Sequence, residues 1–234
     1  MKKYLIAMGG FAQGKNRWNF TRDYNAEVER LFQSTNGYFD GMIRYNNDWL
    51  HQSKYYQDPK VKMVLDLPSF GGVYKPICIL DTMNKMDVGD VVMMIDSNHA
   101  FIDNPDPLIK FTVDHNIFCH DHFIVSYPNC QWTFKDTFIG MGCDEERYWN
   151  APQIQVNITA FCKNDFTMMF VEEWLKYCGD YNVVATNIYK NLPLFVENRF
   201  EQSVISILVE KYHIPLQADP NTIILEKDGI NVNR

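Results

Sequence analysis

The stretch "GDVVMMIDSNHAF", residues 89–101, carries the clearest fold signal in the chain. Its five apolar residues at 91–95 show no polar alternation, which is typical of a strand buried on both faces of a sheet. The run ends at Asp96, and Ser97 and Asn98 follow. Because open α/β sheets bind ligands at the carboxyl ends of their strands, Asp96 either starts a turn or presents its carboxylate to a ligand.

The segments around this stretch alternate between strand-like and helix-like patterns. The predicted strands are 3–8, 39–45, 91–95 and 151–161, and the predicted helices are 25–34, 75–86, 103–116, 166–180 and 199–213. Such alternation favours an α/β fold with a mainly parallel central sheet flanked by helices. We expect one domain over residues 1–215, because the sequence shows neither an internal repeat nor a low-complexity linker. The tail at 216–234 lacks core-like periodicity after Pro220 and is expected to be an arm or a loosely packed end.

The overall composition disfavours several classes of protein. The chain has 234 residues, of which 46% are hydrophobic, and a formal net charge of −7. This charge argues against a nucleic-acid partner, because nucleic-acid binding needs a basic face. No apolar stretch reaches the ~18 residues that a transmembrane segment needs. The six cysteines form no C-x-x-C pair and no secretory signal precedes them, which indicates reduced thiols and a cytoplasmic protein.

A candidate phosphate-binding element lies in "GGVYKPICIL", residues 71–80. Gly71 and Gly72 would let a ligand approach the backbone closely, and Lys75 at a helix start would add a positive charge for a phosphate. On these residues alone, a plain loop-to-helix junction with a solvent-exposed lysine is the preferred interpretation. Similarly, Asp96 and Asn98 could hold a divalent cation beside a diphosphate, although a simple turn is the more common use of such residues.

Two further polar segments carry weaker signals. The cluster "DHNIFCHDHF" at 114–123 has histidines, but their spacing does not match structural zinc sites, so a polar rim of an active-site cleft is the better interpretation. Acidic and polar residues over 196–206 precede an apolar helix. Considered alone, acidic residues at this place are explained by their favourable interaction with the dipole at the start of a helix, so the structural interpretation is preferred.

The order of these segments resembles a group of GT-A type glycosyltransferase-like proteins of bacteria and large viruses. The resemblance covers roughly residues 3–213, and its most specific parts are 74–76, 89–96, 132–136 and 199–203. Members of the group show a Trp/Tyr-Lys-Pro helix start, a Gly-Asp-hydrophobic-Asp segment, a Trp-Thr-Lys-x-Asp stretch and a His-Arg-x-Asp-Gln-Ser helix.

This resemblance implies a single-domain GT-A fold, Rossmann-like, that uses a nucleoside diphosphate sugar, commonly a UDP-sugar, with Mn²⁺ or Mg²⁺. It implies that Asp96 and Asn98 bind the metal, and that Glu201 and Gln202 are catalytic. It further assigns two sets of contacts: donor binding to Met8, Gly9, Gly10, Lys75, Asp96, Ser97 and Asn98, and the acceptor or sugar side to Asp136, Gln155 and Arg199.

The sequence departs from the group's pattern at three positions. Asn98 replaces the second carboxylate of the metal motif, so metal affinity would be lower or the nucleotide would hold the metal. Glu201 is one methylene longer than the usual aspartate, and Asn198 stands in place of a histidine. The latter two changes affect the catalytic role of the 198–203 segment.

The predicted function is therefore that of a hexosyltransferase-type enzyme in polysaccharide biosynthesis. It would move a sugar from the donor to a hydroxyl acceptor on a glycan, with retention of the anomeric configuration. One alternative is a nucleotidyltransferase that forms sugar nucleotides, which the glycine-containing stretch 9–18 loosely imitates. Another is a catalytically degenerate nucleotide- or glycan-binding module, which Asn98 and the altered 198–201 stretch would explain.

Overall fold

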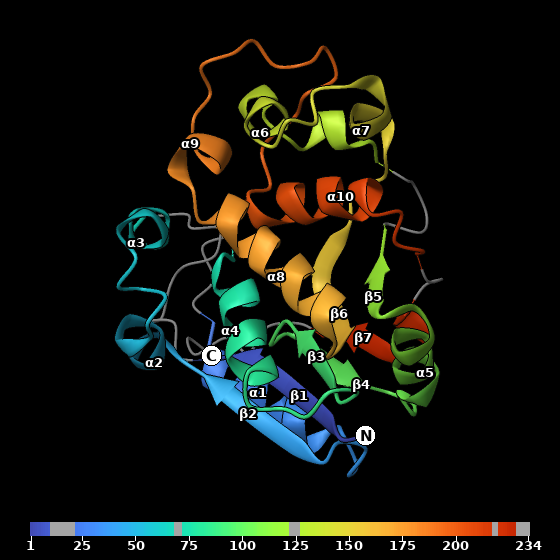
Figure 1. The fold of residues 1–234 in the computed structure, drawn as a ribbon. Helices are drawn as coiled ribbons and strands as arrows, with labels where there is room; N and C mark the ends of the chain where they lie inside the picture. The colour runs from blue at the N-terminus through green and yellow to red at the C-terminus, as the bar shows by residue number, and fades with distance from the viewer. Residues whose placement is uncertain (10–21, 68–71, 122–126, 217–219, 228–234) are drawn as a thin grey trace.

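The computed structural model describes residues 1–9, 22–67, 72–121, 127–216 and 220–227. Its centre is a five-stranded sheet in the order β2-β1-β3-β6-β5 (Figure 1). The strands are β1 (Lys3–Met8), β2 (Gly41–Tyr45), β3 (Val91–Ile95), β5 (Ile117–His120) and β6 (Gln155–Cys162). β1 pairs in parallel with β2 and β3, whereas β6 runs antiparallel to both β3 and β5. The sheet is therefore mainly parallel, with β6 as the reversed strand.

Helices cover both faces of this sheet. They are α1 (Tyr24–Gln33), α2 (Asn47–Gln52), α3 (Pro59–Leu65), α4 (Tyr74–Met83), α5 (Asp106–His115), α6 (Lys135–Gly140), α7 (Glu146–Asn150), α8 (Asp165–Cys178), α9 (Tyr181–Val184) and α10 (Glu201–Lys211). The larger core lies between one face and helices that include α4, α8 and α10, and the smaller core lies under α1 and α5. This arrangement confirms the predicted single α/β domain.

The strand β3 contributes to both cores, as its unbroken apolar run predicted. Val92 and Met94 point into the larger core, and Val91, Met93 and Ile95 into the smaller one. Every residue of β3 is buried. The strand is central because both of its edges are paired, and its carboxyl end delivers Asp96 to the rim of the sheet.

The sequence patterns located most of the major elements but not all of them. β6 starts at Gln155 rather than at 151, and the polar–apolar alternation is limited to its first residues because the strand is fully buried from Ile158 onward. The buried strand β5 falls inside the polar segment 114–123 and was not predicted. The small helices α6, α7 and α9, which pack beyond α10 in Figure 1, were not predicted either.

The segment after Pro220 is packed against the domain over part of its length, which corrects the prediction of a loosely packed end. β7 (Ile224–Glu226) pairs antiparallel with β4 (His99–Phe101), and Ile224 is completely buried in the smaller core. The short strand has little periodicity of its own, so the pairing partner, rather than the local sequence, determines its structure.

Two composition-based expectations can be compared with the structure. All six cysteines are buried free thiols, in agreement with the absence of a disulfide framework. Within the described residues, no helix combines the length and apolar character that crossing a bilayer would require.

Candidate functional site

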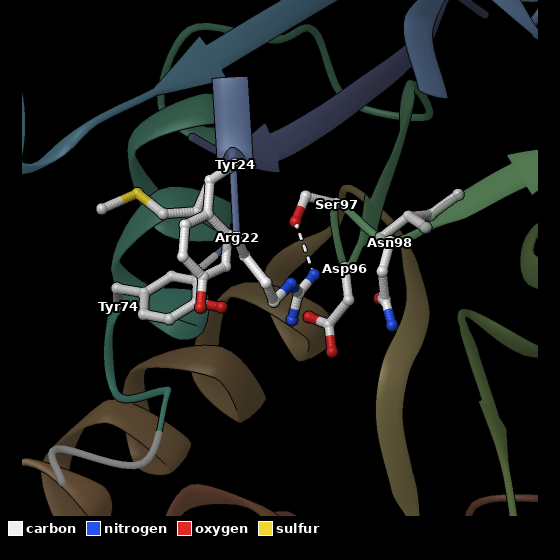
Figure 2. A pocket seen from close by; sticks show the side chains of 8 residues that line it. Arg22, Tyr24, Tyr74, Asp96, Ser97 and Asn98 are labelled. Atoms are coloured by element: carbon white, nitrogen blue, oxygen red, sulfur yellow. Dashed lines mark hydrogen bonds between the residues drawn. The ribbon is translucent and has the colours of Figure 1, made fainter. Parts of the chain in front are cut away.

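A polar cavity of about 220 Å³ opens at the carboxyl ends of β1 and β3. Figure 2 shows the side chains that surround it. The lining residues are Met8, Arg22, Tyr24, Tyr74, Ile95, Asp96, Ser97 and Asn98. Four of the predicted donor-binding residues, Met8, Asp96, Ser97 and Asn98, are thus brought together in one place. Gly9 follows Met8 directly and donates its backbone N–H to the Tyr45 carbonyl at 2.8 Å, while Gly10 and Gly71 lie outside the described residues.

Lys75 and Asp96 form an ion pair at the end of β3. The Lys75 Nζ lies 2.8 Å from Asp96 Oδ1 and donates a second hydrogen bond of 2.8 Å to the carbonyl of Val156 in β6. The lysine side chain is almost completely buried, so the preferred sequence interpretation of a solvent-exposed lysine was wrong. Because the buried Lys75 ammonium is bonded to both groups, it holds the half-exposed Asp96 carboxylate in a fixed position before any ligand binds.

Arg22 is a cavity residue that sequence reasoning missed. Its Nε donates to Glu27 Oε1 at 2.8 Å, its Nη2 contacts Glu27 Oε2, and Ser97 Oγ donates to the same carboxylate at 2.7 Å. Glu27 is completely buried, which holds the guanidinium in one orientation beside Asp96, as Figure 2 shows. No pattern in the sequence distinguishes Arg22 from the other arginines, because its position depends on a buried glutamate one turn into α1.

Two tyrosines form the aromatic part of the cavity wall. The Arg22 guanidinium lies 4.6 Å from the ring centre of Tyr24, and Tyr74 comes from the first turn of α4. Burial, followed by the negative charge of Asp96, raises the pKa of Tyr74 well above its usual value. The Tyr74 hydroxyl therefore stays protonated. The Tyr-Lys-Pro motif at 74–76 includes Tyr74, but only its lysine was predicted to have a role.

Asn98 is held by its neighbours in the strand pair β4–β7. Its Nδ2 donates to Glu226 Oε1 at 2.7 Å, and its Oδ1 lies 3.0 Å from His99 Nδ1. Within the described ranges, no group of three or more His, Cys, Asp or Glu side chains could hold a metal ion. These side chains fit a divalent cation only if Asp96, which is half-exposed, is its one protein carboxylate ligand. Phosphate and water oxygens would supply the remaining ligands.

Glu201 lies at the first position of α10 and is buried. Its pKa is raised to about 8, chiefly by burial and also by the negative charge of Asp96, against the lowering effects of the Lys75 charge and of backbone hydrogen bonds. Among the described residues, Glu201 Oε2 has no hydrogen-bond partner. The coupling to both Lys75 and Asp96 connects Glu201 electrostatically to the ion pair at the end of β3.

Gly72 provides the space that the Glu201 carboxyl occupies. It has a φ of +79°, and a Cβ at this position would lie 2.3 Å from Glu201 Oε1. Glycine is thus required both by the backbone conformation and by the close approach of the carboxyl. The adjacent Trp174 donates from Nε1 to the Glu201 carbonyl at 2.8 Å, which fixes the start of α10. Gln202, the second predicted catalytic residue, is partly exposed on the same turn.

The predicted acceptor-side residues do not line this cavity. Asp136 is buried and accepts hydrogen bonds from the backbone N–H groups of Ile188 at 2.9 Å and Tyr189 at 3.0 Å. Burial alone would raise the pKa of Asp136, but these N–H donors lower it overall. Asp136 thus serves to anchor a loop. Arg199 lies 4.8 Å from the Trp132 ring centre and 2.5 Å from Glu197, and Gln155 begins β6 beside the Val156 carbonyl.

The histidine-containing segment 114–123 does not form a metal site in the part that the structure describes. His120 is buried at the end of β5, with Nε2 3.1 Å from the Asn157 side-chain oxygen. His122 lies outside the described residues. Described residues Ile117–His120 are a core strand, so the expected polar rim is incorrect for this part of the segment.

A second, larger depression of about 750 Å³ lies elsewhere on the domain. It is lined mainly by residues of α3, α4, α8 and α9 and by the segment before α3. None of the predicted site residues lines it. The smaller cavity at the strand ends therefore remains the candidate site, since it combines the predicted residues with buried charge.

The α/β fold of this chain is similar to that of a solved glycosyltransferase. Mouse xyloside xylosyltransferase 1 in its apo form superposes on this chain with a TM-score of 0.52 at 9% identity, over 94% of this chain and 86% of that one. At this identity the similarity shows the fold alone.

Two other solved structures are more distant. A glycosyltransferase involved in the glycosylation of the major capsid of PBCV-1 gives a TM-score of 0.43 at 13% identity, over 93% of this chain and 81% of that one. Mannose-6-phosphate isomerase from Helicobacter pylori gives 0.38 at 11% identity, over 97% and 94%. Neither score is high enough to carry an argument. No model of a known protein family and no curated protein matches the chain.

Proposed function

We propose that this protein is a glycosyltransferase that moves a sugar from a nucleoside diphosphate sugar to a hydroxyl acceptor on a glycan. The observation that carries this proposal is the buried Lys75–Asp96 pair at the carboxyl end of β3, next to a cavity in a glycosyltransferase fold. Ligands of open α/β sheets bind at this edge. In the reaction, the bond between the anomeric carbon and the diphosphate breaks and the nucleoside diphosphate leaves with the electron pair. The acceptor oxygen forms the new glycosidic bond as its hydroxyl proton is released.

The charges around the cavity suit a donor that carries a diphosphate. Arg22 and Lys75 are both fixed by buried partners, so they present positive charge without reorganisation when the donor binds. The Nε and Nη2 groups of Arg22 are bonded to Glu27, so Arg22 would act on a phosphate as a nearby positive charge. The tyrosines at 24 and 74 offer ring surface for a nucleobase. UDP is the proposed nucleotide.

A divalent cation, Mn²⁺ or Mg²⁺, would be held by Asp96 and chiefly by the donor phosphates. When bound, it would offset the negative charge that develops on the leaving diphosphate. Asn98 contributes less than a second carboxylate would, because its amide oxygen faces His99 and its amide nitrogen is bonded to Glu226. Lys75 supplies a positive charge at the same carboxylate.

Glu201 would orient the donor sugar as a neutral carboxyl. With a pKa of about 8 it is mostly protonated at neutral pH, so it can both donate and accept a hydrogen bond with a sugar hydroxyl. Gln202 on the same turn is the proposed second contact. Retention of the anomeric configuration and a role in polysaccharide synthesis are parts of this proposal that product analysis must test.

A catalytically degenerate binding module is the second candidate function. The engaged Asn98 side chain and the protonated Glu201 favour it, since both reduce the negative charge that a metal-dependent transferase would use. The nucleotidyltransferase alternative depended on residues 9–18, which lie outside the described residues except for Gly9.

A thermal-shift panel distinguishes these functions. UDP, GDP, CDP and ADP are added with and without Mn²⁺ to the wild type and to Lys75→Met, with Lys85→Met as a matched control because Lys85 is an exposed surface lysine. At a hundredfold excess over Kd, linkage gives roughly 2.7 kcal/mol of stabilisation, or about 5–10 °C. We expect a shift with UDP in the wild type and in Lys85→Met, and a much smaller one in Lys75→Met.

The same panel is followed by mass spectrometry of UDP-sugars incubated with glycan acceptors. Sugar transfer supports the enzyme, and nucleotide binding without transfer or hydrolysis supports the degenerate module. If no nucleoside diphosphate shifts the melting temperature, both forms of the proposal fail and Asp96 is a structural turn residue.

A further inference from the structure

A loop with exposed apolar side chains joins α9 to α10. Residues 185–200 form no helix or strand, and they run along the top edge of the view in Figure 1. Four large apolar side chains in this loop are open to solvent: Ile188 (79% exposed), Tyr189 (53%), Leu194 (60%) and Val196 (62%). The other exposed large apolar residues of the described chain are scattered along the sequence. Clustered exposure of this kind marks an interaction surface.

The loop is held in place by its backbone and by two side chains, which leaves the apolar side chains outside. Asp136 binds the N–H groups of residues 188 and 189, and Asn191 Oδ1 accepts from the Lys135 N–H at 2.9 Å. The Phe195 ring stacks on Phe134 with centroids 5.4 Å apart. The Val196 N–H donates to the Gln131 carbonyl at 2.8 Å. The exposure therefore belongs to an ordered conformation and not to a loop without fixed contacts.

The charge of this segment differs from that of the whole protein. The chain has a net charge of −7, but residues 181–196 contain no carboxylate and one lysine, Lys190, which is exposed. The next carboxylate, Glu197, is paired with Arg199 at 2.5 Å. A tyrosine and a lysine next to exposed aliphatic side chains are the composition found at the interface between a bilayer and water.

We propose that the loop 188–196 inserts its apolar side chains into the interfacial region of a lipid bilayer and docks the domain on a membrane surface. A second protein fits less well, because four side chains offer a few hundred Å², below the about 800 Å² per partner of a stable interface. A loop at the edge of the domain is also suited to a deformable surface. Binding is reversible, because the inserted area is small. This inference does not depend on the proposed transfer reaction.

Vesicle co-sedimentation tests the proposal with the full chain. The probes are vesicles of phosphatidylcholine alone and of phosphatidylcholine with one quarter phosphatidylglycerol. We expect the wild type to bind both, and Ile188→Asp combined with Leu194→Asp to bind at least about tenfold more weakly, because charged side chains resist insertion. Val88→Asp is the matched control, since Val88 is 77% exposed in the turn before β3 and outside the loop.

A second variant keeps the test independent of any loss of folding. Leu194→Trp replaces an exposed residue, and its fluorescence should shift to the blue when vesicles are added, since an inserted indole leaves water. Circular dichroism and the melting temperature check that all variants fold. The proposal is overturned if the wild type does not bind either vesicle at millimolar lipid, or if Val88→Asp weakens binding as much as the loop variant. A dimer that Ile188→Asp dissociates in light scattering would likewise overturn it, by showing a protein partner instead.

Discussion

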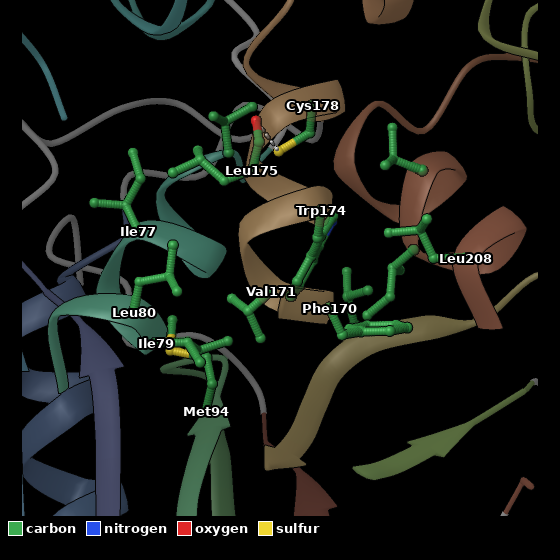
Figure 3. Close-up of a cluster of buried hydrophobic side chains, with 14 of the residues drawn as sticks. Ile77, Ile79, Leu80, Met94, Phe170, Val171, Trp174, Leu175, Cys178 and Leu208 are labelled. Carbon is green, nitrogen blue, oxygen red and sulfur yellow. Dashed lines mark hydrogen bonds between the residues drawn. The ribbon is translucent and has the colours of Figure 1, made fainter. Parts of the chain in front are cut away.

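The two ends of α4 lie in opposite environments. Its first turn brings Tyr74 to the wall of the polar cavity and Lys75 to the Asp96 carboxylate, and the rest of the helix packs against α8 and β3 in the larger core. Figure 3 shows this core, where side chains of α4, such as Ile77 and Leu80, lie in one apolar cluster with side chains of β3, α8 and α10. Partly desolvated charges lie at the cavity end of α4, and apolar side chains surround the rest of the helix.

This difference shows how the fold tolerates a site whose buried charges add little to its stability. Buried ion pairs such as Lys75–Asp96 and Arg22–Glu27 contribute little net stability, because desolvation offsets their attraction. The apolar region beside them carries most of the hydrophobic stabilisation. Substitutions in the core should therefore reduce the free energy of unfolding, while those in the site should mainly change pH dependence and ligand binding.

The largest effect is expected for Trp174→Ala in the core. Trp174 is completely buried in α8 and also donates a hydrogen bond to the Glu201 carbonyl. The variant should lose about 3–5 kcal/mol of unfolding free energy, as large-to-small core substitutions do. Urea denaturation measures this loss. A loss below 1 kcal/mol would contradict the assignment of Trp174 to the stabilising region, and Trp149→Ala on the surface helix α7 serves as the control.

The next largest effect concerns the pH dependence of stability at Glu201. In the unfolded chain this carboxyl ionises near pH 4.5, but in the folded protein its pKa is about 8. The folded state therefore retains the proton longer, so stability falls as pH rises from about 4.5 to about 8. Glu201→Gln should remove this decline and be more stable than the wild type at pH 8, by roughly a few kcal/mol.

Urea titrations at pH 5 and pH 8 measure this difference between Glu201→Gln and the wild type. Glu210→Gln, near the other end of the same helix α10 and partly exposed, is the matched control and should follow the wild type. Parallel pH profiles for the wild type and Glu201→Gln would show that Glu201 ionises normally in the folded protein.

A smaller effect separates backbone conformation from close approach at Gly72. Gly72 and Gly37 both have φ of +79°, but only at Gly72 would a Cβ meet a neighbour within 4 Å, namely Glu201. Gly37→Ala should cost about 1 kcal/mol from backbone strain alone, whereas Gly72→Ala should cost about 1–3 kcal/mol more because the buried carboxyl must move. Thermal denaturation compares the two. Equal losses of stability in the two variants would show that the Glu201 carboxyl moves away from the added Cβ at no cost in free energy.

The smallest effect is expected at the start of α8, on the edge of the core. The Asn164 side chain accepts from the Thr167 N–H at 2.9 Å, and the Thr167 hydroxyl accepts from the Asn164 N–H at 3.0 Å. Asn164→Ala should cost about 1 kcal/mol, the usual value for a lost helix cap. Asn164→Asp keeps the acceptor and should recover most of the stability in the same denaturation experiment.

The sequence predicted those parts of the molecule whose structure depends on local pattern. The apolar run at 91–95 and the helical stripes of α8 and α10 have a periodicity that tertiary contacts did not override. β5 and β7 were missed for the opposite reason. Each is short, and its strand conformation depends on pairing with β6 or β4, which lie far away in sequence.

The candidate site was predicted only where its residues lie on such elements. Asp96 and Ser97 were found because they follow β3, and Lys75 because it starts α4. Arg22 was not found, since its orientation depends on the buried Glu27 and on Ser97, a contact across 75 residues. Asp136 was predicted at the acceptor side from its polar placement in the Trp-Thr-x-Lys-Asp segment, which gave no sign of the two loop N–H groups that it binds.

The pairing of β7 with β4 has a consequence for the order in which the chain is made. Asn98 is held by Glu226, which follows it by 128 residues. During synthesis, β1, β2 and β3 leave the ribosome early, but the Asn98 side of the cavity obtains its support only after every α-helix that the structure describes has been translated. Contacts of this sequence separation form late and slowly. Ile224 of the same strand completes the smaller core. That core and the Asn98 side of the cavity are therefore finished together, at the end of synthesis.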